Sequence, residues 1–334
     1  MNLWGSGELL LEKYPVFFEE LLQAFAGMKK ETAISSEVLR LYRLFFSKGD
    51  EKIRRVFVPE FTYGTLYRCM AENPAKLDIS GYDSHEGYRE ILKILGYMKG
   101  VPEVSLHVYD RKEWEEESED TEKFDAIGIY MPEGAEAGSV MAKNRKSRKL
   151  MEKIGPISKG ELPFLLSAFS MLKEDGVLAA ILPGALLYRE GKESQLRRFL
   201  VSEKNGLDLV MLLPDHILQT AGQKEVLLLL RKNRPGRDVM FFDCSEVESF
   251  GSEQLNAIGI AWKERKTVPG FCSRVEQTEL EQNDFNLNLP RYIVKTVKVA
   301  KVDIDARKKR IAEIDRELEE IEERIAMYKR EQEF

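Results

Sequence analysis

The chain has 334 residues, of which 43% are hydrophobic and 32% are charged, and its formal net charge is -6. These values are typical of a water-soluble protein that can bury a substantial core. The net charge argues against nucleic-acid binding through bulk electrostatics alone, although a local basic patch could still bind. The three cysteines show no metal-site spacing. No stretch approaches ~18 uncharged apolar residues, and the acidic start lacks the basic region of a signal peptide, so we expect a cytoplasmic protein without a membrane span.

The first half of the chain predicts helices followed by strands. Amphipathic runs over residues 8–47 predict two helices, and we assign residues 1–48 to a helical amino-terminal segment. Short apolar runs then predict four strands, at residues 56–61, 76–83, 104–110 and 124–130. Helical patterns follow the first two of these strands, which is the order of strand and helix that parallel pairing requires.

The second half continues this alternation. Helices are predicted over residues 160–176 and 193–206, and strands at residues 177–183, 207–214, 225–233 and 238–245. The turn at residues 234–237 predicts an antiparallel edge hairpin between the last two strands. We therefore predict an α/β fold over residues 49–295 with a doubly wound sheet of the seven-stranded type, that is, about seven strands with the hairpin added at one edge of a parallel sheet.

The tail predicts one long helix with a narrow apolar stripe. Six residues recur alternately three and four positions apart and are Ile311, Ile314, Leu318, Ile321, Ile325 and Tyr328. A helix from residue 303 to the end would reach about 48 Å, longer than a small domain needs. We predict that residues 296–334 form a coiled-coil helix whose stripe packs on a partner helix. Packing of the stripe on its own domain is the alternative.

Three passages, taken with this order of elements, resemble a known family. They are "AFSMLKEDGVLAAILPGALLYREGKESQLRRFL", "LDLVMLLPDHILQTAGQKEVLLLLRKN" and "NDFNLNLPRYI". They are similar to passages of the methylation subunits of type I restriction-modification systems, which are adenine-N6 DNA methyltransferases that use S-adenosylmethionine. The resemblance runs from about residue 30 to the end, and it implies the class I S-adenosylmethionine-dependent methyltransferase fold.

The cofactor loop is the first place where the chain departs from the family. The family's loop reads Asp-Pro-x-x-Gly-x-Gly, whereas this chain keeps Gly64 and carries Phe61 and Tyr63, which would fill space meant for the cofactor. Asp83 and Asp110 match positions where the family holds the cofactor's ribose and adenine. Helix caps or solvated loop residues are the alternative for these two acids. We therefore expect no cofactor, unless the pocket is open to S-adenosylmethionine.

The catalytic loop departs as well. In the family, "NPPF" follows the strand that corresponds to residues 124–130, so that an asparagine and a carbonyl hold the target amino group while an aromatic ring stacks on the flipped adenine. The corresponding residues here are Tyr130, Met131, Pro132 and Glu133. Tyrosine does not reproduce the amide geometry, and Glu133 offers a base no stacking face, so no catalytic residue is expected.

A basic run follows the altered loop, on the side where the family holds DNA. It contains Lys143, Arg145, Lys146, Arg148 and Lys149. A basic loop of this kind neutralises phosphates without reading sequence, so we predict a DNA contact here. A solvated charge run with no ligand is the alternative.

These features predict a catalytically degenerate DNA adenine-N6 methyltransferase-like subunit. It would pair with an active methylation subunit and a specificity subunit, and contact DNA, in a type I-like modification complex. One alternative is an active S-adenosylmethionine-dependent methyltransferase in which Tyr130 or Glu133 accepts the amine hydrogen bond. Another is a regulatory module that senses the cofactor or binds only partner proteins.

Overall fold

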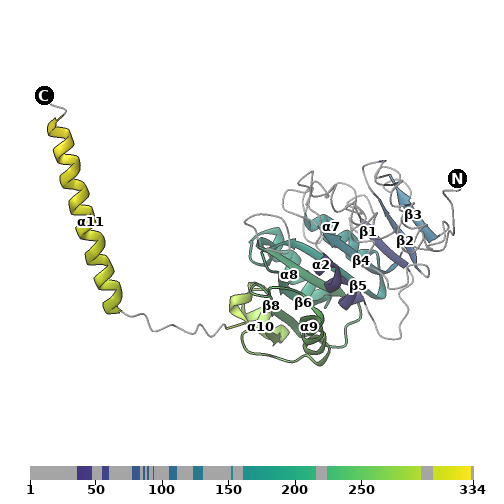
Figure 1. Ribbon diagram of the computed structural model, residues 1–334. Helices are drawn as coiled ribbons and strands as arrows, with labels where there is room; N and C mark the ends of the chain where they lie inside the picture. Colours follow the sequence, from purple (N-terminus) through teal and green to yellow (C-terminus); the bar gives the residue numbers. More distant parts are fainter. Residues whose placement is uncertain are drawn as a thin grey trace, which may run out of the picture. The chain divides into compact units, whose positions relative to one another are not determined.

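The computed structural model describes residues 36–46, 55–59, 77–82, 86, 89, 93, 105–110, 123–130, 152, 161–215, 224–294 and 304–331. The chain divides into two units, residues 1–294 and 295–334. The first unit is built on one β-sheet with helices on both faces (Figure 1). Among its described residues, the second unit is a single helix.

The sheet has nine strands in the order β3-β2-β1-β4-β5-β7-β6-β8-β9. They are β1 (Arg55–Pro59), β2 (Asp78–Tyr82), β3 (Leu106–Tyr109), β4 (Phe124–Tyr130), β5 (Leu172–Pro183), β6 (Leu207–Leu212), β7 (Glu225–Arg231), β8 (Val239–Asp243) and β9 (Cys272–Val275). Strands β7 and β9 run antiparallel to their neighbours, whereas the other neighbouring strands pair in parallel. The α/β prediction is confirmed, but the prediction of a seven-stranded sheet is wrong. All eight predicted strand segments lie in this one sheet, and β9, which was not predicted, brings the number to nine.

The predicted hairpin between the strands now labelled β7 and β8 is also wrong. Strand β7 lies between β5 and β6 and is antiparallel to both, while β8 pairs in parallel with β6. The turn at residues 234–237 therefore carries the chain across β6. The physical reason is burial, since residues 225–230 are buried and the apolar ones divide between both faces of the sheet. Such a two-faced apolar strand belongs in the interior of a sheet.

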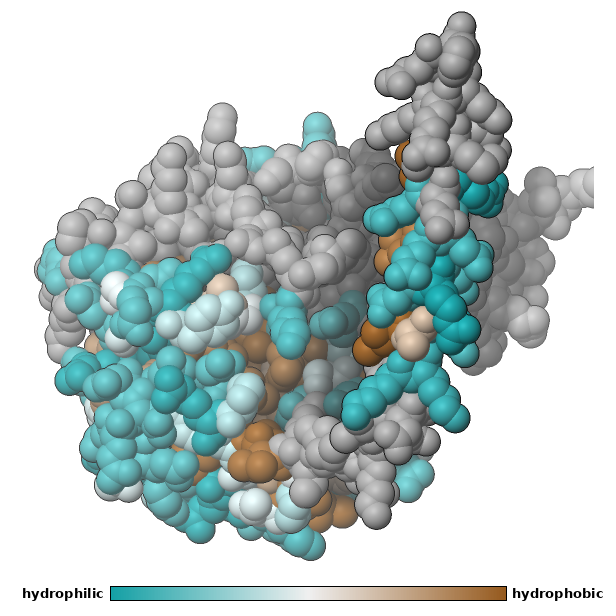
Figure 2. All heavy atoms as spheres, turned by 90° about the vertical axis from the view of Figure 1, so that its left-hand side faces the viewer, coloured by the Kyte–Doolittle hydropathy of each residue, from teal (hydrophilic) through white to brown (hydrophobic). Residues whose placement is uncertain are grey.

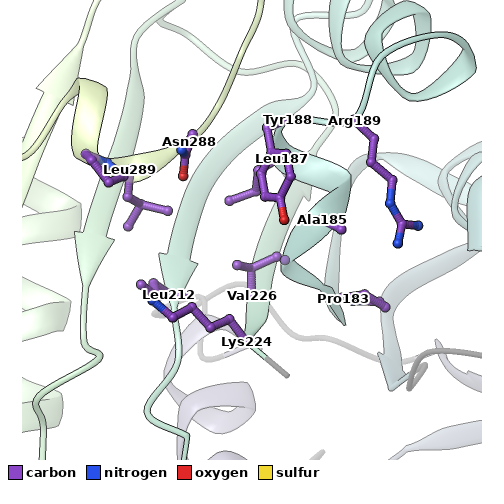
Figure 3. Close-up of a pocket in the computed structure, with 12 residues that line it drawn as sticks. Pro183, Ala185, Leu187, Tyr188, Arg189, Leu212, Lys224, Val226, Asn288 and Leu289 are labelled. Carbon is purple, nitrogen blue, oxygen red and sulfur yellow. The ribbon is translucent and has the colours of Figure 1, made fainter. Parts of the chain in front are cut away.

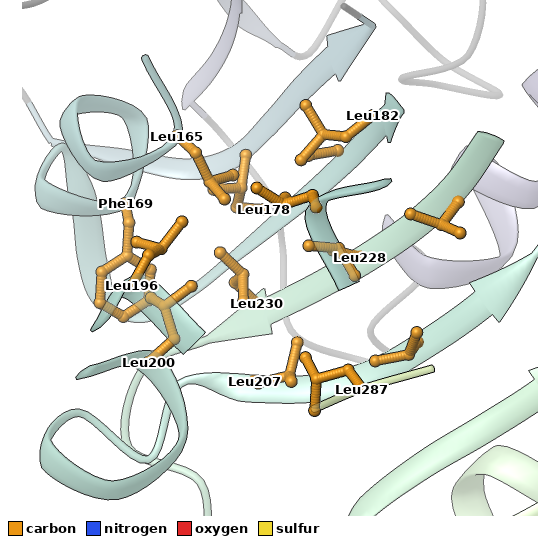
Figure 4. Packing of buried hydrophobic residues seen from close by; sticks show 14 of the residues in the cluster. Leu165, Phe169, Leu178, Leu182, Leu196, Leu200, Leu207, Leu228, Leu230 and Leu287 are labelled. Atoms are coloured by element: carbon orange, nitrogen blue, oxygen red, sulfur yellow. The ribbon is translucent and has the colours of Figure 1, made fainter. Parts of the chain in front are cut away.

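Helices form two layers around the sheet (Figure 1). The elements are α2 (Ser36–Phe46), α7 (Glu161–Ser170), η4 (Gly184–Leu187), α8 (Lys192–Arg198), η5 (Phe199–Glu203), α9 (Ser252–Glu264), α10 (Gln277–Gln282) and η6 (Leu289–Arg291). Helices α7, α8 and α10 pack on one face, together with Leu178 and Leu182 of β5 (Figure 4). Helices α2 and α9 pack on the other face, with Ala179 and Ile181. This alternation along β5 is the period of two expected of a strand buried on both sides.

Two predicted helices are shorter in the structure. The helix predicted over residues 160–176 ends at Ser170, and β5 already begins at Leu172. The register between β5 and β4 shifts between Phe124 and Ala126 of β4. Residues 173–176 of β5 therefore form a bulge outside the hydrogen-bonded ladder. The helix predicted over residues 193–206 is an α-helix only to Arg198 and continues as a π-helix to Glu203.

A buried ion-pair network joins the extension of the sheet to its centre. Asp208 at the start of β6 is fully buried and accepts a hydrogen bond from Trp262 Nε1 of α9 at 2.9 Å. Its carboxylate also pairs with Arg265 and with Arg234 Nε, the latter at 3.0 Å. Burial alone would raise the pKa of Asp208, but Arg265 and Arg234 outweigh burial and lower it. The network thereby fixes α9 and the β7–β8 connection on β6.

Candidate functional site

The carboxyl ends of the parallel strands define where a ligand site is expected. After β1 the chain builds β2 and β3 on one side and returns to build β4 and β5 on the other side. Such a switch point opens a crevice beyond the strand ends, and open α/β sheets bind ligands there. By this rule a ligand site is expected beyond Pro59 of β1 and Tyr130 of β4, the neighbouring strands at the switch point.

Tyr130 is the one predicted catalytic-loop position within the described residues. It ends β4 and is 8% exposed, and it belongs to the buried layer that also contains Tyr42, Val58 and Ile181. The Tyr42 hydroxyl of α2 donates a hydrogen bond to the backbone carbonyl of Ile129, which holds this helix under the end of β4. The Tyr130 side chain therefore contributes to the core.

Asp110 follows β3, which is separated from β4 by β2 and β1, and it lies at the same edge of the sheet. Its Oδ2 accepts a hydrogen bond from Arg89 Nη1 at 3.0 Å, in a half-buried ion pair. Asp110 thus lies at a strand end, as the sequence predicted, but its carboxylate already carries a cationic partner. Gly64, Asp83, Met131, Pro132, Glu133 and the basic run at 143–149 lie outside the described residues. Of the predicted cofactor and catalytic positions, the described residues include only Tyr130 and Asp110.

A pocket of about 410 Å³ opens at the same edge, beyond β5 and β6 (Figure 3). Three stretches that are distant in the sequence line it, together with Leu212 at the end of β6. Residues 183–185 and 187–189 form one wall, Lys224 and Val226 come from the start of β7, and residues 288–290 form the opposite wall. The volume lies within the roughly 300–1,000 Å³ of ordinary ligand pockets.

Backbone hydrogen bonds hold the pocket's walls together. Leu287 N donates to the carbonyl of Leu187 at 2.9 Å, which joins the two opposite walls. Gly184 N donates to the carbonyl of Lys224 at 2.8 Å, which fixes the turn after β5 to the start of β7. A Cβ on Gly184 would lie 2.8 Å from that same carbonyl oxygen, so the close approach requires glycine.

The side chain of Arg197 in α8 also connects the same two walls. It is buried, and it donates from Nε to the carbonyl of Phe285 at 2.7 Å and from Nη1 to the carbonyls of Leu186 and Arg189 at 2.8 Å each. Burial lowers the pKa of the Arg197 guanidinium, while the nearby carboxylates of Glu190 and others raise it in part. A guanidinium remains charged under these conditions, so it can serve as a permanent donor to all three carbonyls.

Polar side chains stand at the rim above an apolar floor. Leu187, Leu212, Val226 and Leu289 supply the floor, whereas Tyr188, Arg189, Lys224 and Asn288 supply the polar groups. In Figure 3 the Tyr188 hydroxyl points into the pocket toward Val226. Within the described part of the chain, the side chains of Tyr188, Lys224 and Asn288 make no hydrogen bond or ion pair, so they are available to a ligand.

Sequence reasoning did not identify this pocket, although its walls lie within the three passages that carry the family resemblance. The first passage contains Tyr188 and Arg197, the second contains Lys224, and the third contains Asn288. The missing information was spatial, because the first and third stretches lie about a hundred residues apart along the chain. In the third passage Asp284 and Phe285 adopt positive φ angles of 52° and 55°, a feature that only the structure shows. Non-glycine residues with positive φ angles are often found at catalytic and ligand-binding sites.

The second unit offers a different candidate surface. Helix α11 (Ile304–Glu331) has 28 residues and is about 42 Å long. Figure 2 shows apolar side chains along it among hydrophilic ones. Ile311, Ile314, Leu318, Ile321 and Ile325 are between 42% and 58% exposed, and the side chain of Tyr328 lies outside the described residues. A lone helix has no neighbour in the described part of its own unit to cover this stripe.

Membrane and metal features are limited to what the described residues contain. In that part of the chain, no helix combines the length and apolar character needed to cross a bilayer. The same residues hold no group of three or more His, Cys, Asp or Glu side chains that could bind a metal ion.

Comparisons with known proteins agree on one family. The sequence profile of N-6 DNA methylases matches residues 63–300. The chain is 28% identical over 169 residues to the type I restriction enzyme MpnII methylase subunit of Mycoplasma pneumoniae, covering 48% of this chain and 31% of that protein. It is 30% identical over 126 residues to the MjaVIII methylase subunit of Methanocaldococcus jannaschii, covering 34% and 22% respectively. The matches thus span about a third or less of these curated relatives.

A solved structure has the same fold. The type I restriction-modification methyltransferase subunit from Streptococcus thermophilus superposes with a TM-score of 0.67 at 24% identity, covering 78% of this chain and 58% of that one. The likeness extends the family match from sequence to architecture. Because the family profile covers most of the sequence, the chain belongs to the N-6 DNA methylase family.

Proposed function

We propose that the chain is a catalytically degenerate member of its family, which acts as a structural and DNA-binding subunit of a type I-like DNA modification complex. The observation that carries the proposal is the burial of Tyr130 at the end of β4, where the family resemblance expects an exposed asparagine. A side chain that is 8% exposed and packed in the core presents little surface to a target base. Amide geometry at this position is what adenine recognition needs.

The cofactor side supports the same proposal. The sequence carries Phe61 and Tyr63 where the family's loop has small residues, and Asp110 pairs with Arg89 at 3.0 Å. Cofactor recognition at Asp110 would compete with this ion pair. A chain with both losses retains the scaffold of a methyltransferase without the means to hold and use S-adenosylmethionine.

The partner side rests on α11 and on the basic run. The stripe of five exposed apolar residues at alternating spacings of three and four suits a helical partner. An active methylation subunit and a specificity subunit are the proposed partners. The basic run at residues 143–149 is the proposed contact to DNA phosphates.

Cofactor binding and methyl transfer test the proposal directly. We would titrate the purified chain with S-adenosylmethionine by calorimetry, beside an active family member as the positive control. We expect no binding heat at roughly millimolar cofactor. Methyl transfer to DNA adenine by the purified chain, abolished by Tyr130→Ala, would refute the proposal. Tyr130→Phe is the matched variant, because it keeps the ring in the core and removes only the hydroxyl.

A further inference from the structure

The pocket beyond β5 and β6 has the chemistry of a site for an anion joined to a flat polar ring. None of its twelve lining residues is acidic, whereas Arg189 and Lys224 are both cationic. Lys224 places a positive charge at the cavity with no lining acid to offset it, which favours an anionic ligand. Lys224 makes no ion pair within the described residues, so its charge is available.

Tyr188 and Asn288 restrict the ligand further. Tyr188 is 51% exposed, which is unusual for a large aromatic side chain, and its ring borders the apolar floor. A half-exposed ring at a rim is a stacking surface for a planar group. The carboxamide of Asn288 offers both donors and an acceptor, which matches the mixed edge of a nucleobase.

We propose that this pocket holds one unpaired nucleotide of a DNA strand. The base stacks on Tyr188 and meets Asn288 with its edge, while the adjoining phosphate lies by Lys224. The inference rests on the proposed DNA-binding function and extends it with a defined contact. The pocket differs from the altered catalytic loop, because that loop follows β4 whereas the pocket lies beyond β5, β7 and β6. The stacking part of the contact accepts any base.

An acidic peptide is the competing occupant. A carboxylate would pair with Lys224 equally well, but it would leave the exposed ring of Tyr188 unused. The observations together favour the nucleotide, because it uses the ring, the amide and the cation at once. The competing occupant becomes one outcome of the test.

The experiment measures binding of a fluorescent oligothymidylate of roughly ten nucleotides by anisotropy, with the full chain and a duplex of the same length. We expect the single strand to bind, and Tyr188→Ala to weaken it about fivefold or more, as the loss of one stacked base does. Tyr188→Phe keeps the stacking face and should bind within about twofold of the unchanged chain. Lys224→Ala should lower the slope of log affinity against log salt by about 0.7.

The control is Lys263→Ala, because Lys263 is an exposed residue of α9, which packs on the opposite face of the sheet from η4 and η6 at the pocket walls. In a chain that carries Lys263→Ala, Tyr188→Ala should weaken single-strand binding by the same factor as it does in the unchanged chain. Circular dichroism would verify that each variant is folded, and the exposure of Tyr188 makes unfolding by its substitution unexpected.

Three outcomes would overturn the inference. The first is that the single strand does not bind. The second is that the Tyr188→Ala and Tyr188→Phe variants bind it equally well. The third is that polyglutamate displaces the oligonucleotide while substitution of Tyr188 leaves oligonucleotide binding unchanged. The proposed function fails separately, through methyl transfer by the purified chain. A chain that methylates DNA and still shows the Tyr188 effect would keep the pocket inference and lose the proposed degeneracy.

Discussion

Replacement of Arg197 by methionine tests how the pocket is held together. The guanidinium donates three hydrogen bonds, and those to Phe285 and Leu186 are buried. A bond from a charged donor contributes ~1.5 kcal/mol at the lower end, so losing two buried ones costs about 3 kcal/mol of unfolding free energy. Water can replace the third, to Arg189, because that bond is only partly buried. A loss of about 3 kcal/mol is a large share of the ~5–15 kcal/mol that stabilises a typical protein.

Urea unfolding followed by fluorescence and by circular dichroism measures this loss, with an unchanged slope against denaturant as the criterion of a comparable transition. The neighbouring Arg198→Met is the matched control. Arg198 is exposed and lies 4.9 Å from the centre of the Phe285 ring, so its loss should cost only about 0.5–1 kcal/mol. If the two methionine variants had equal stability, the reasoning that Arg197 fastens the two walls would be wrong.

Further predictions concern the helix, the turn after β5 and one titrating group. Leu318→Asp in α11 should abolish co-purification with partner subunits through the loss of an apolar seam residue, whereas Arg316→Asp on the opposite side of the helix should not. Gly184→Ala should lower the unfolding free energy by about 1–3 kcal/mol, since its Cβ would lie 2.8 Å from the carbonyl oxygen of Lys224, and a cost near zero in urea titrations would contradict this. Burial raises the pKa of Tyr292 to about 12 from an ordinary value of 10.0. The neutral phenol is thus favoured in the folded state, so stability is complete below pH ~10 and falls by about 2–3 kcal/mol as pH rises to ~12. Tyr292→Phe should show a flatter profile over that range, and identical profiles would refute the assignment.

The fold was predictable wherever a segment's own pattern decides its structure. The apolar run of residues 225–230 reads as a buried strand, and so it is. Its neighbours in the sheet were not predictable in the same way, because pairing depends on which other strands offer two buried faces. The turn at Arg234 and Pro235 carries only local information, and a hairpin is the simplest interpretation of such a turn. Strand β9 was missed because its four residues include Ser273 and Arg274 and show little apolar signal.

The site was less predictable than the fold for the same physical reason. A pocket is a property of segments that meet in space, and this one joins stretches around Tyr188, Lys224 and Asn288. Family resemblance identified the passages without giving any of these residues a role. The prediction for Asp110 named its place at a strand end correctly, but the pairing with Arg89 depends on a helix position that no motif encodes.

The docking of α2 has a consequence for how the chain folds during synthesis. Glu37 accepts a hydrogen bond from Phe250 N, 213 residues away, and Phe45 of α2 packs edge-on against Trp262 at 5.2 Å. At a synthesis rate of roughly 5–20 residues per second, these partners emerge about 10–40 s after α2 does. During that interval the apolar face formed by Leu41, Tyr42 and Phe45 lacks its final cover. A chaperone that binds short apolar helices on the ribosome would therefore have its best opportunity at this segment.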